Sequence, residues 1–284
     1  MRERVCTFGP EESLVGVLTE PDPAKVLPGA PTVVVSNVGL NHHVGPYRLW
    51  VELARQLAER GISTLRFDLS GLGDSRPRRA GGPDEFQRAR EETRAALDYL
   101  EQKKGQRRFV LIGLCSGVDS VHAVTVQDAR VVGAAFIDGY TYRTAGYHLR
   151  FQFRYLSPRR WSRYLRKRKL PAQLREAGEA DEVYTREYPE QARLMEDYGR
   201  LLERGVNLCF VFSGGMGLSY NYERQFYEMF SPLKLENRVT YAFYPHADHL
   251  FSVPDDRADL LRKLIAWAVG AVPPRALTES RPTG

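Results

Sequence analysis

The stretch Phe-Val-Leu-Ile-Gly-Leu-Cys-Ser-Gly-Val-Asp-Ser, residues 109–120, decides how the rest of the chain is arranged. Its first four residues are apolar and partly β-branched, a pattern typical of a buried strand. Gly113 and Gly117 each stand two positions from Cys115 and let the backbone turn sharply without a Cβ clash. A helix-compatible segment comes next. The stretch therefore predicts a strand, a very tight turn and a helix, with the Cys115 side chain at the apex of the turn.

Outward from this stretch, strand-like and helix-like segments alternate along most of the chain. The predicted strands are residues 14–18, 31–36, 62–67, 109–112, 131–137, 206–212 and 239–244. The predicted helices are residues 47–59, 86–104 and 255–269, together with the segment that follows the tight turn. This alternation predicts the α/β class, with a mostly parallel sheet and helices on both faces.

The alternation stops between residues 140 and 204, where the sequence has aromatic, basic and acidic helical segments but no strand pattern. An insertion at this point lies above the carboxyl ends of the parallel strands, where ligands bind in such sheets. We therefore expect a core of residues 1–139 and 205–272 and a helical cap of residues 140–204. The Pro-, Arg- and Thr-rich end, residues 273–284, is expected to be disordered.

The composition is that of an ordinary globular chain, with 43% hydrophobic and 27% charged residues. No apolar run resembles a signal peptide or is long enough for a transmembrane helix, so we expect a cytoplasmic protein. The three cysteines, Cys6, Cys115 and Cys209, are widely spaced. This spacing predicts reduced thiols and neither a disulfide framework nor a metal site. No cofactor is expected.

The net charge of +6 comes from one segment. Residues 150–169 hold nine Arg and Lys and no acid, and the remaining 32 basic residues are outnumbered by 35 acidic ones. The excess therefore belongs to one surface element, and we expect no nucleic-acid partner. A solvated helix face, a nucleic-acid patch, a membrane-surface helix and a docking face are the alternatives for the segment. Among its functional interpretations we favour an anionic or carrier-bound acyl substrate, with an acyl carrier protein as the partner.

Three motifs follow one another along the chain: Asp68-x-x-Gly71-x-Gly73-x-Ser75, Gly113-x-Cys115-x-Gly117 and Ala247-Asp248-His249-x-Phe251. In this order and spacing they resemble the post-strand loop, the nucleophile elbow and the catalytic-histidine loop of α/β-hydrolases. Residues 44–68 together with Gly-Leu-Cys-Ser-Gly are similar to bacterial members with a cysteine at the elbow, including the exosortase-associated hydrolases and the Dieckmann cyclases that off-load tetramate polyketides. The resemblance implies an α/β-hydrolase fold with a catalytic triad.

The resemblance places the nucleophile at Cys115, where serine is usual. A thiol at a helix N-terminus and beside a histidine is readily ionised, and the thiolate is the reactive form. The neighbouring Ser116 is the competing nucleophile, and its hydroxyl points away if Cys115 occupies the apex. His249 matches the family's general base, and His246, three residues earlier, is the alternative.

The family's acid is missing from its usual loop, because residues 213–221 contain no carboxylate. Asp138, at the carboxyl end of the preceding strand, takes this role in some family members and is the predicted acid, which orients the imidazole and stabilises its charged form. A helix or turn cap is the alternative role for Asp138. For the oxyanion, the predicted backbone donors are Ser116 and one of Val38 and Gly39.

Four further residues are candidate substrate contacts. His42 and His43 follow the strand at 31–36 and precede the next helix, near the predicted oxyanion loop, with a plain surface position as the alternative. Arg150 and Arg154 begin the basic segment of the predicted cap. No residue is predicted to bind a metal.

Together these residues predict an enzyme that transfers an acyl group from an ester or thioester through a covalent acyl-cysteine. Hydrolysis is the default outcome. An off-loading or cyclising reaction of the Dieckmann type on a carrier-bound thioester is the first alternative. A non-catalytic binding protein of the hydrolase fold is the second, and the acid missing from residues 213–221 is its best support.

Overall fold

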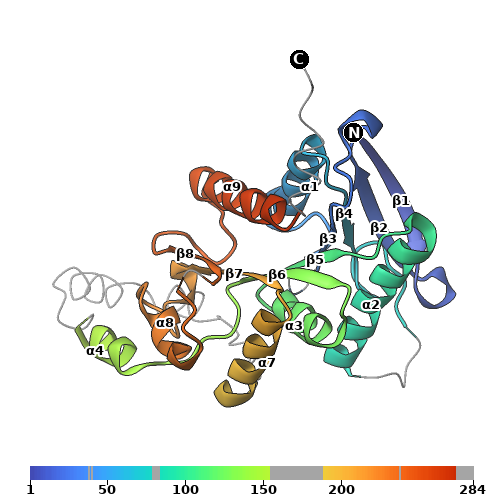
Figure 1. Cartoon of the computed structure of the whole chain (residues 1–284). Coiled ribbons are helices and arrows are strands. Elements are labelled where there is room, and N and C mark those ends of the chain that lie inside the picture. Colours follow the sequence, from blue (N-terminus) through green and yellow to red (C-terminus); the bar gives the residue numbers. More distant parts are fainter. Residues whose placement is uncertain (38, 40, 79–83, 154–187, 237, 273–284) are drawn as a thin grey trace, which may run out of the picture.

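The computed structural model describes residues 1–37, 39, 41–78, 84–153, 188–236 and 238–272 (Figure 1). Its described residues form one eight-stranded sheet in the order β1-β2-β4-β3-β5-β6-β7-β8. The strands are β1 (Arg2–Phe8), β2 (Leu14–Glu20), β3 (Thr32–Val35), β4 (Thr64–Phe67), β5 (Phe109–Leu114), β6 (Val131–Ile137), β7 (Asn207–Ser213) and β8 (Thr240–Tyr244). β2 is antiparallel to both neighbours, and the strands from β4 to β8 pair in parallel. The predicted α/β fold with a mostly parallel sheet is confirmed.

Helices cover both faces of this sheet (Figure 1). The helices of the described residues are α1 (Leu49–Glu59), α2 (Glu85–Lys104), α3 (Gly117–Gln127), α4 (Ala145–Phe153), α7 (Gln191–Glu203), α8 (Gln225–Met229) and α9 (Pro254–Gly270). Of these, α4 lies away from the sheet and adds no residue to its cores. Alternate strand residues feed two cores, because successive side chains of a strand point to opposite faces. Val34 and Leu111 belong to the core under α2, α3 and α7, while Val33 and Val110 belong to the core under α1 and α9. Burial on both faces explains the continuous apolar runs of these strands.

The turn between β5 and α3 has the predicted elbow geometry. Cys115 has a φ of 54°, a left-handed conformation that side-chain-bearing residues seldom adopt. A Cβ on Gly113 would lie 2.6 Å from the carbonyl carbon of Gly117, and a Cβ on Gly117 would lie 2.4 Å from the carbonyl oxygen of Asn37. Both positions therefore require glycine, and the strand and helix come close enough to hold Cys115 at the apex.

We expect the substitution Gly117→Ala to destabilise the fold by about 1–3 kcal/mol or more, because the added methyl group has to displace backbone. Gly199→Ala, inside α7, is the matched control. Its Cβ would meet only a leucine side chain at 3.5 Å, so it is expected to be neutral or stabilising by up to about 1 kcal/mol. Urea unfolding of both variants measures the difference. Equal stabilities would show that the elbow tolerates a methyl group.

The first strand is a difference from the sequence prediction. β1 was not predicted, and β2 extends two residues beyond the predicted end at residue 18. β1 is an edge strand in which Phe8 is buried, Cys6 is half-buried and the other residues are exposed, so its apolar contacts are too few for a pattern to reveal. It is held instead by its ladder with β2 and by ion pairs such as Arg4 with Glu20 and Glu3 with Arg55.

The predicted cap of residues 140–204 needs a correction at its end. α7 was assigned to the cap, but Leu194, Tyr198 and Leu201 pack in the same core as Phe136 and Phe210 of the sheet. α7 is therefore the helix that covers the sheet between β6 and β7, as Figure 1 shows. Residues 154–187, most of the predicted cap, and the tail at 273–284 lie outside the described residues, so both remain predictions.

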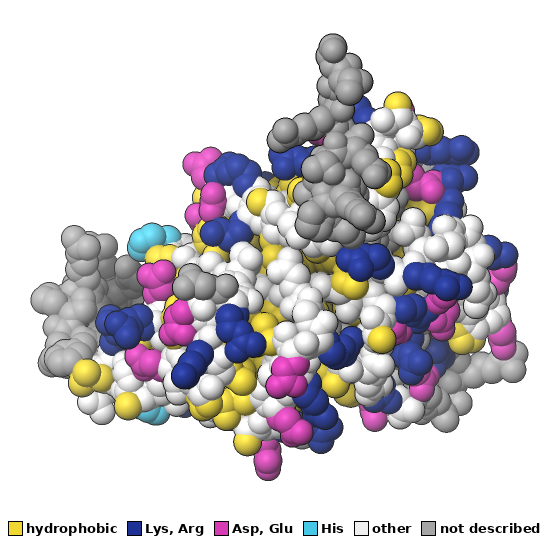
Figure 2. Space-filling model, viewed as in Figure 1, with side chains coloured by type: hydrophobic (Ala, Val, Ile, Leu, Met, Phe, Trp, Pro, Cys, Tyr) yellow, Lys and Arg dark blue, Asp and Glu magenta, His cyan; other side chains and the backbone are white. Residues whose placement is uncertain are grey.

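The surface carries both signs of charge. Lys and Arg are interspersed with Asp and Glu over the face seen in Figure 2. Of the nine basic residues between 150 and 169, Arg150 alone belongs to the described part of the chain. Within that part, no helix is long and apolar enough to cross a bilayer.

Candidate active site

Three strand ends bring Cys115, His249 and Asp138 together. Cys115 follows β5, Asp138 follows β6, and His249 stands in the loop after β8, so parallel pairing places all three at the carboxyl edge of the sheet. The Nδ1 of His249 lies 2.8 Å from Oδ2 of Asp138. The imidazole also interacts with the side chain of Cys115. The ring therefore joins the carboxylate to the thiol.

Asp138 is held by three donors. Its Oδ1 accepts a hydrogen bond from the Ser213 backbone N–H (2.7 Å), and its Oδ2 accepts from the Ser213 hydroxyl (2.6 Å) and from His249. The carboxylate is fully buried, while about a third of the His249 side chain is exposed. Asp138 thus fixes the ring orientation, and the other edge of the ring remains accessible. Ser213 was not singled out from the sequence, although a polar residue at the end of a buried strand is a signal for it.

The packing of the histidine loop excludes side chains at two positions of the loop after β7. A Cβ on Gly215 would lie 2.4 Å from the backbone nitrogen of His249, and a Cβ on Gly214 would lie 2.2 Å from the carbonyl oxygen of Pro245. The Gly215 N–H also donates to the carbonyl of Ala247 (3.1 Å). The two loops therefore touch backbone to backbone, which leaves no room for a carboxylate side chain at these glycines.

The electrostatics favour a charged pair. Hydrogen bonding to Asp138, followed by the interaction with Cys115, raises the pKa of His249 to about 10 despite its partial burial. The ring is therefore an imidazolium at neutral pH. A neighbouring cation and the N-terminus of α3 both stabilise the thiolate form of a cysteine. The arrangement places a cationic proton donor in contact with the Cys115 side chain.

This pair makes a pH-dependent contribution to stability. The pKa of His249 rises from an ordinary value of 6.5 to about 10 on folding, so the contribution is complete below about pH 6.5 and is lost as the pH rises through about 10. We therefore expect the stability difference between the wild type and His249→Gln to shrink between these pH values in urea unfolding titrations. A difference that stays constant or grows over this range would contradict the raised pKa.

The two neighbours of His249 in the motif have other positions. The predicted alternative base, His246, is exposed, whereas His249 is the histidine that meets the Asp138 carboxylate. Asp248 accepts hydrogen bonds from the backbone N–H groups of Leu250 (2.8 Å) and Ser252 (3.0 Å), so it caps the turn of the histidine loop.

Two of the three predicted oxyanion residues, Ser116 and Gly39, lie at the elbow. Ser116 begins α3 beside Cys115, and its hydroxyl accepts a hydrogen bond from the Gly39 N–H at 2.8 Å. The Gly39 N–H thus points to a side-chain oxygen of the elbow. Val38 lies outside the described residues. The assignment of the oxyanion donors remains a prediction.

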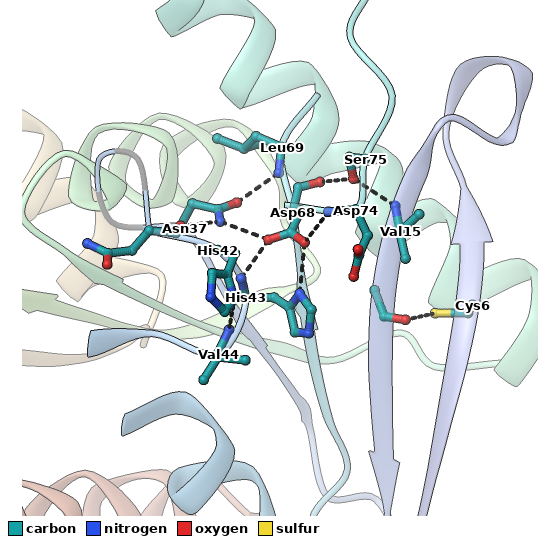
Figure 3. A network of polar contacts seen from close by, with 12 residues as sticks. Cys6, Val15, Asn37, His42, His43, Val44, Asp68, Leu69, Asp74 and Ser75 are labelled. Atoms are coloured by element: carbon teal, nitrogen blue, oxygen red, sulfur yellow. Dashed lines mark hydrogen bonds and ion pairs between the residues drawn. The ribbon is translucent and has the colours of Figure 1, made fainter. Parts of the chain in front are cut away.

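The candidate substrate contacts are not gathered at one place. The ring of His43 turns inward, with Nδ1 at 2.8 Å from Oδ2 of the buried Asp68, while His42 is exposed (Figure 3). The guanidinium of Arg150 lies over the ring of Tyr222, 4.8 Å from its centroid. Arg154 lies outside the described residues. His43 is therefore part of the protein's own hydrogen-bond network, and a substrate contact stays a prediction for the others.

One group of side chains has the composition of a metal site. Possible ligand atoms of His43, Asp68 and Asp74 lie within 4.8 Å of one another. However, the carboxylate of Asp68 already accepts hydrogen bonds from the Asn37 side chain, from the backbone and ring of His43 and from the Asp74 backbone (Figure 3). These donors occupy the oxygen lone pairs that a cation needs, so the three residues form a hydrogen-bond network centred on Asp68.

Solved structures with the same architecture support the fold. An α/β serine hydrolase without a lid from Xanthomonas campestris is 14% identical, with a TM-score of 0.56 and 96% of each chain covered. An esterase from Pyrococcus furiosus is 13% identical, with a TM-score of 0.58, covering 96% of this chain and 92% of that one. A putative α/β-hydrolase of unknown function from Agrobacterium tumefaciens is 14% identical, with a TM-score of 0.57 and both chains fully covered. No curated protein matches the sequence significantly.

At these identities the likeness to the solved structures shows the fold alone. The sequence profile of one family, however, spans nearly the whole core. It matches residues 26–268, which include the elbow, Asp138 and His249. The chain therefore belongs to the alpha/beta hydrolase family.

Proposed function

We propose that this protein is an acyl-transfer enzyme that acts on an ester or thioester through a covalent intermediate on Cys115. The observation that carries the proposal is the His249 ring, which bonds to the buried carboxylate of Asp138 on one side and interacts with Cys115 on the other. This is the arrangement of nucleophile, base and orienting acid that covalent acyl transfer requires.

The proposed reaction has two halves. The Cys115 thiolate attacks the carbonyl carbon, and the backbone N–H of Ser116 stabilises the oxyanion that forms. The imidazolium of His249 then donates its proton to the departing alcohol or thiol, and the acyl group stays on sulfur as a thioester. In the second half His249 takes a proton from the incoming nucleophile, which attacks the thioester and releases the Cys115 sulfur.

Water is the proposed nucleophile in the second half, which makes the protein an esterase or thioesterase. Membership of the hydrolase family supports this choice, and the similar solved structures include a protein described as an esterase. The resemblance to Dieckmann cyclases supports the alternative, in which a carbon nucleophile of a carrier-bound substrate closes a ring. A thiol suits either outcome, because thioesters exchange readily with thiolates.

The structure weakens the case for a non-catalytic binding protein. That alternative depended on the acid missing from residues 213–221. Asp138 lies at 2.8 Å from His249 instead, so the ring has a carboxylate partner.

We also propose a cytoplasmic location, because a nucleophilic thiol has to stay reduced.

A panel of acyl esters and acyl thioesters tests the proposal. Intact-mass measurement after short incubation is expected to show one acyl group per chain, which peptide mapping places on Cys115. The released product separates the two outcomes, because a free acid means hydrolysis and a ring with the leaving thiol means cyclisation. Carrier-bound and free thioesters of the same acyl group compare the proposed carrier protein with a small thiol. Absence of acyl-cysteine with every member of the panel would contradict the enzyme.

A further inference from the structure

We propose that Asn37 is a positioning residue for acyl transfer, because its side chain holds the loop that faces the elbow. The inference rests on the function proposed above and adds a residue to it. Asn37 follows β3 directly after Ser36 and is 3% exposed. The sequence motifs do not include it. We propose that the Asn37 side chain acts on the reaction through the loop that it holds, and not by contact with the reacting atoms.

The Asn37 amide uses both of its ends (Figure 3). Its Oδ1 accepts a hydrogen bond from the Leu69 backbone N–H at 2.8 Å. Its Nδ2 donates to the carbonyl of Asn41 at 2.8 Å and to Oδ1 of Asp68 at 3.3 Å. The partners fix which end is oxygen and which is nitrogen, since one is a donor and two are acceptors. The side chain thus ties the start of the loop to its own far end and to the loop after β4.

The same loop meets the elbow at two points. The carbonyl oxygen of Asn37 lies so close to Gly117 that a Cβ there would approach it to 2.4 Å. Two residues later, the Gly39 N–H donates to the hydroxyl of Ser116 at 2.8 Å. The backbone on either side of residue 38 is therefore docked against the first turn of α3, beside the nucleophile. A shift of Asn37 is therefore transmitted through Gly39 to Ser116, the residue next to Cys115.

Asp68 makes the anchor rigid. Besides Asn37, it accepts hydrogen bonds from the His43 ring (2.8 Å) and the Asp74 backbone (3.1 Å). Burial by itself raises the pKa of Asp68, but the bonds from His43 and Asp74 outweigh it, so the pKa lies below its usual value and the carboxylate is charged. A Cβ on Gly73 would lie 2.2 Å from Oδ2 of Asp68, so this side of the carboxylate is closely packed. Asn37 is therefore hydrogen-bonded to a charged and closely packed carboxylate.

Asn37 lies apart from the residues that ionise the thiol. Cys115, Asp138 and His249 follow β5, β6 and β8, whereas the Asn37 side chain bonds to Asn41, Asp68 and Leu69. Loss of the Asn37 side chain is expected to loosen the contact between Gly39 and Ser116 and so to displace the Ser116 N–H, the proposed oxyanion donor, while the thiol–imidazole pair stays intact. Removing one oxyanion donor lowers kcat by about 10²–10³-fold, which is the upper limit for an indirect effect.

The test combines two reactions of Cys115 in the intact protein. For Asn37→Ala we expect kcat for acyl transfer to fall by about 10–10²-fold with KM nearly unchanged, within the limit set by loss of a whole donor. Alkylation of Cys115 by iodoacetamide forms no oxyanion, so its rate is expected to stay at the wild-type value. Asn207→Ala is the matched control, since that side chain donates one bond at the opposite edge of the sheet. It is expected to leave both reactions unchanged.

Asn37→Asp is the second variant, for the case in which Asn37→Ala does not fold. It keeps the size and the acceptor for Leu69, but it places a second carboxylate beside Asp68. Two adjacent carboxylates share a proton more readily at low pH. The ratio of kcat between Asn37→Asp and the wild type is therefore expected to rise as the pH falls. A ratio independent of pH would contradict the role of the Asn37–Asp68 contact.

The outcomes separate this inference from the proposed function. Wild-type kcat in Asn37→Ala, or a parallel fall of kcat and the alkylation rate, would overturn the positioning role. If the wild type itself transfers no acyl group, the proposed function fails and this role in acyl transfer fails with it. In that case amide hydrogen exchange at His43 and Leu69 still reports on the anchor. Faster exchange in Asn37→Ala supports the anchoring, and unchanged exchange removes it.

Discussion

Replacing Cys115 with alanine is expected to abolish acyl transfer, with a loss of at least about 10⁴-fold in kcat. The sulfur forms the covalent bond to the acyl group in the proposed mechanism, and no neighbouring group takes over. The hydroxyl of Ser116 accepts a hydrogen bond from Gly39, so it belongs to the loop contact. Intact mass measures the absence of an acyl adduct, and steady-state kinetics measure the loss of turnover.

Cys6→Ala is the control for the Cys115 variant. The thiol of Cys6 is half-buried and donates to the carbonyl of Gly16, in the hairpin of β1 and β2. Its loss is expected to leave turnover unchanged. Retention of acylation in Cys115→Ala, with the adduct on Ser116 or another residue, would contradict the assignment of the nucleophile.

Replacing Asp138 with asparagine is expected to lower kcat by about 10⁴-fold while the fold is retained. The asparagine amide can keep its oxygen on the Ser213 N–H, but its nitrogen then faces Nδ1 of His249. Because an amide N–H donates and cannot accept a hydrogen bond, Nδ1 becomes the acceptor and the neutral imidazole carries its proton on the nitrogen that faces Cys115. The variant also removes the main cause of the raised pKa of His249.

A second buried His–Asp pair supplies the control for this variant. His122 of α3 and Asp197 of α7 approach to 3.3 Å, and both are largely buried. Asp197→Asn is expected to lower stability but to leave kcat unchanged, since this pair joins two helices in the core. Loss of the acid in such a triad lowers kcat by about 10⁴-fold. If Asp138→Asn keeps more than about a tenth of the wild-type kcat, Asp138 is therefore not the orienting acid.

Much of the fold could be predicted from local patterns. The β-branched runs are found as strands, because their residues are buried on both faces of the sheet. The Gly-x-Cys-x-Gly turn is found as well, because the close backbone contacts of its glycines exclude a Cβ. β1 could not be predicted, because ion pairs with β2 and α1 hold a strand whose first three residues are charged and whose apolar contacts are limited to its last residues. α7 was assigned to the wrong part although Leu194, Tyr198 and Leu201 recur at helical spacing.

The position of Asp138 was predictable, because parallel pairing brings the ends of β6 and β7 together and the resemblance implied a carboxylate at this strand end. Its role as the acid stays a prediction. Asn37 and Ser213 were missed, because their contacts depend on how separate loops meet in space. His43 was expected at the substrate, and its turn towards Asp68 is likewise a tertiary contact.

The central claim is that the Cys115 sulfur is held as a reactive thiolate by the imidazolium of His249, and iodoacetamide labelling at neutral pH measures this directly. Peptide mass spectrometry over time gives the rates for the three cysteines. We expect Cys115 to be alkylated well before Cys6 and Cys209, since burial raises the pKa of both other thiols. In His249→Ala this advantage is expected to disappear. Equal slow labelling of the cysteines, or an unchanged Cys115 rate in His249→Ala, would contradict the account.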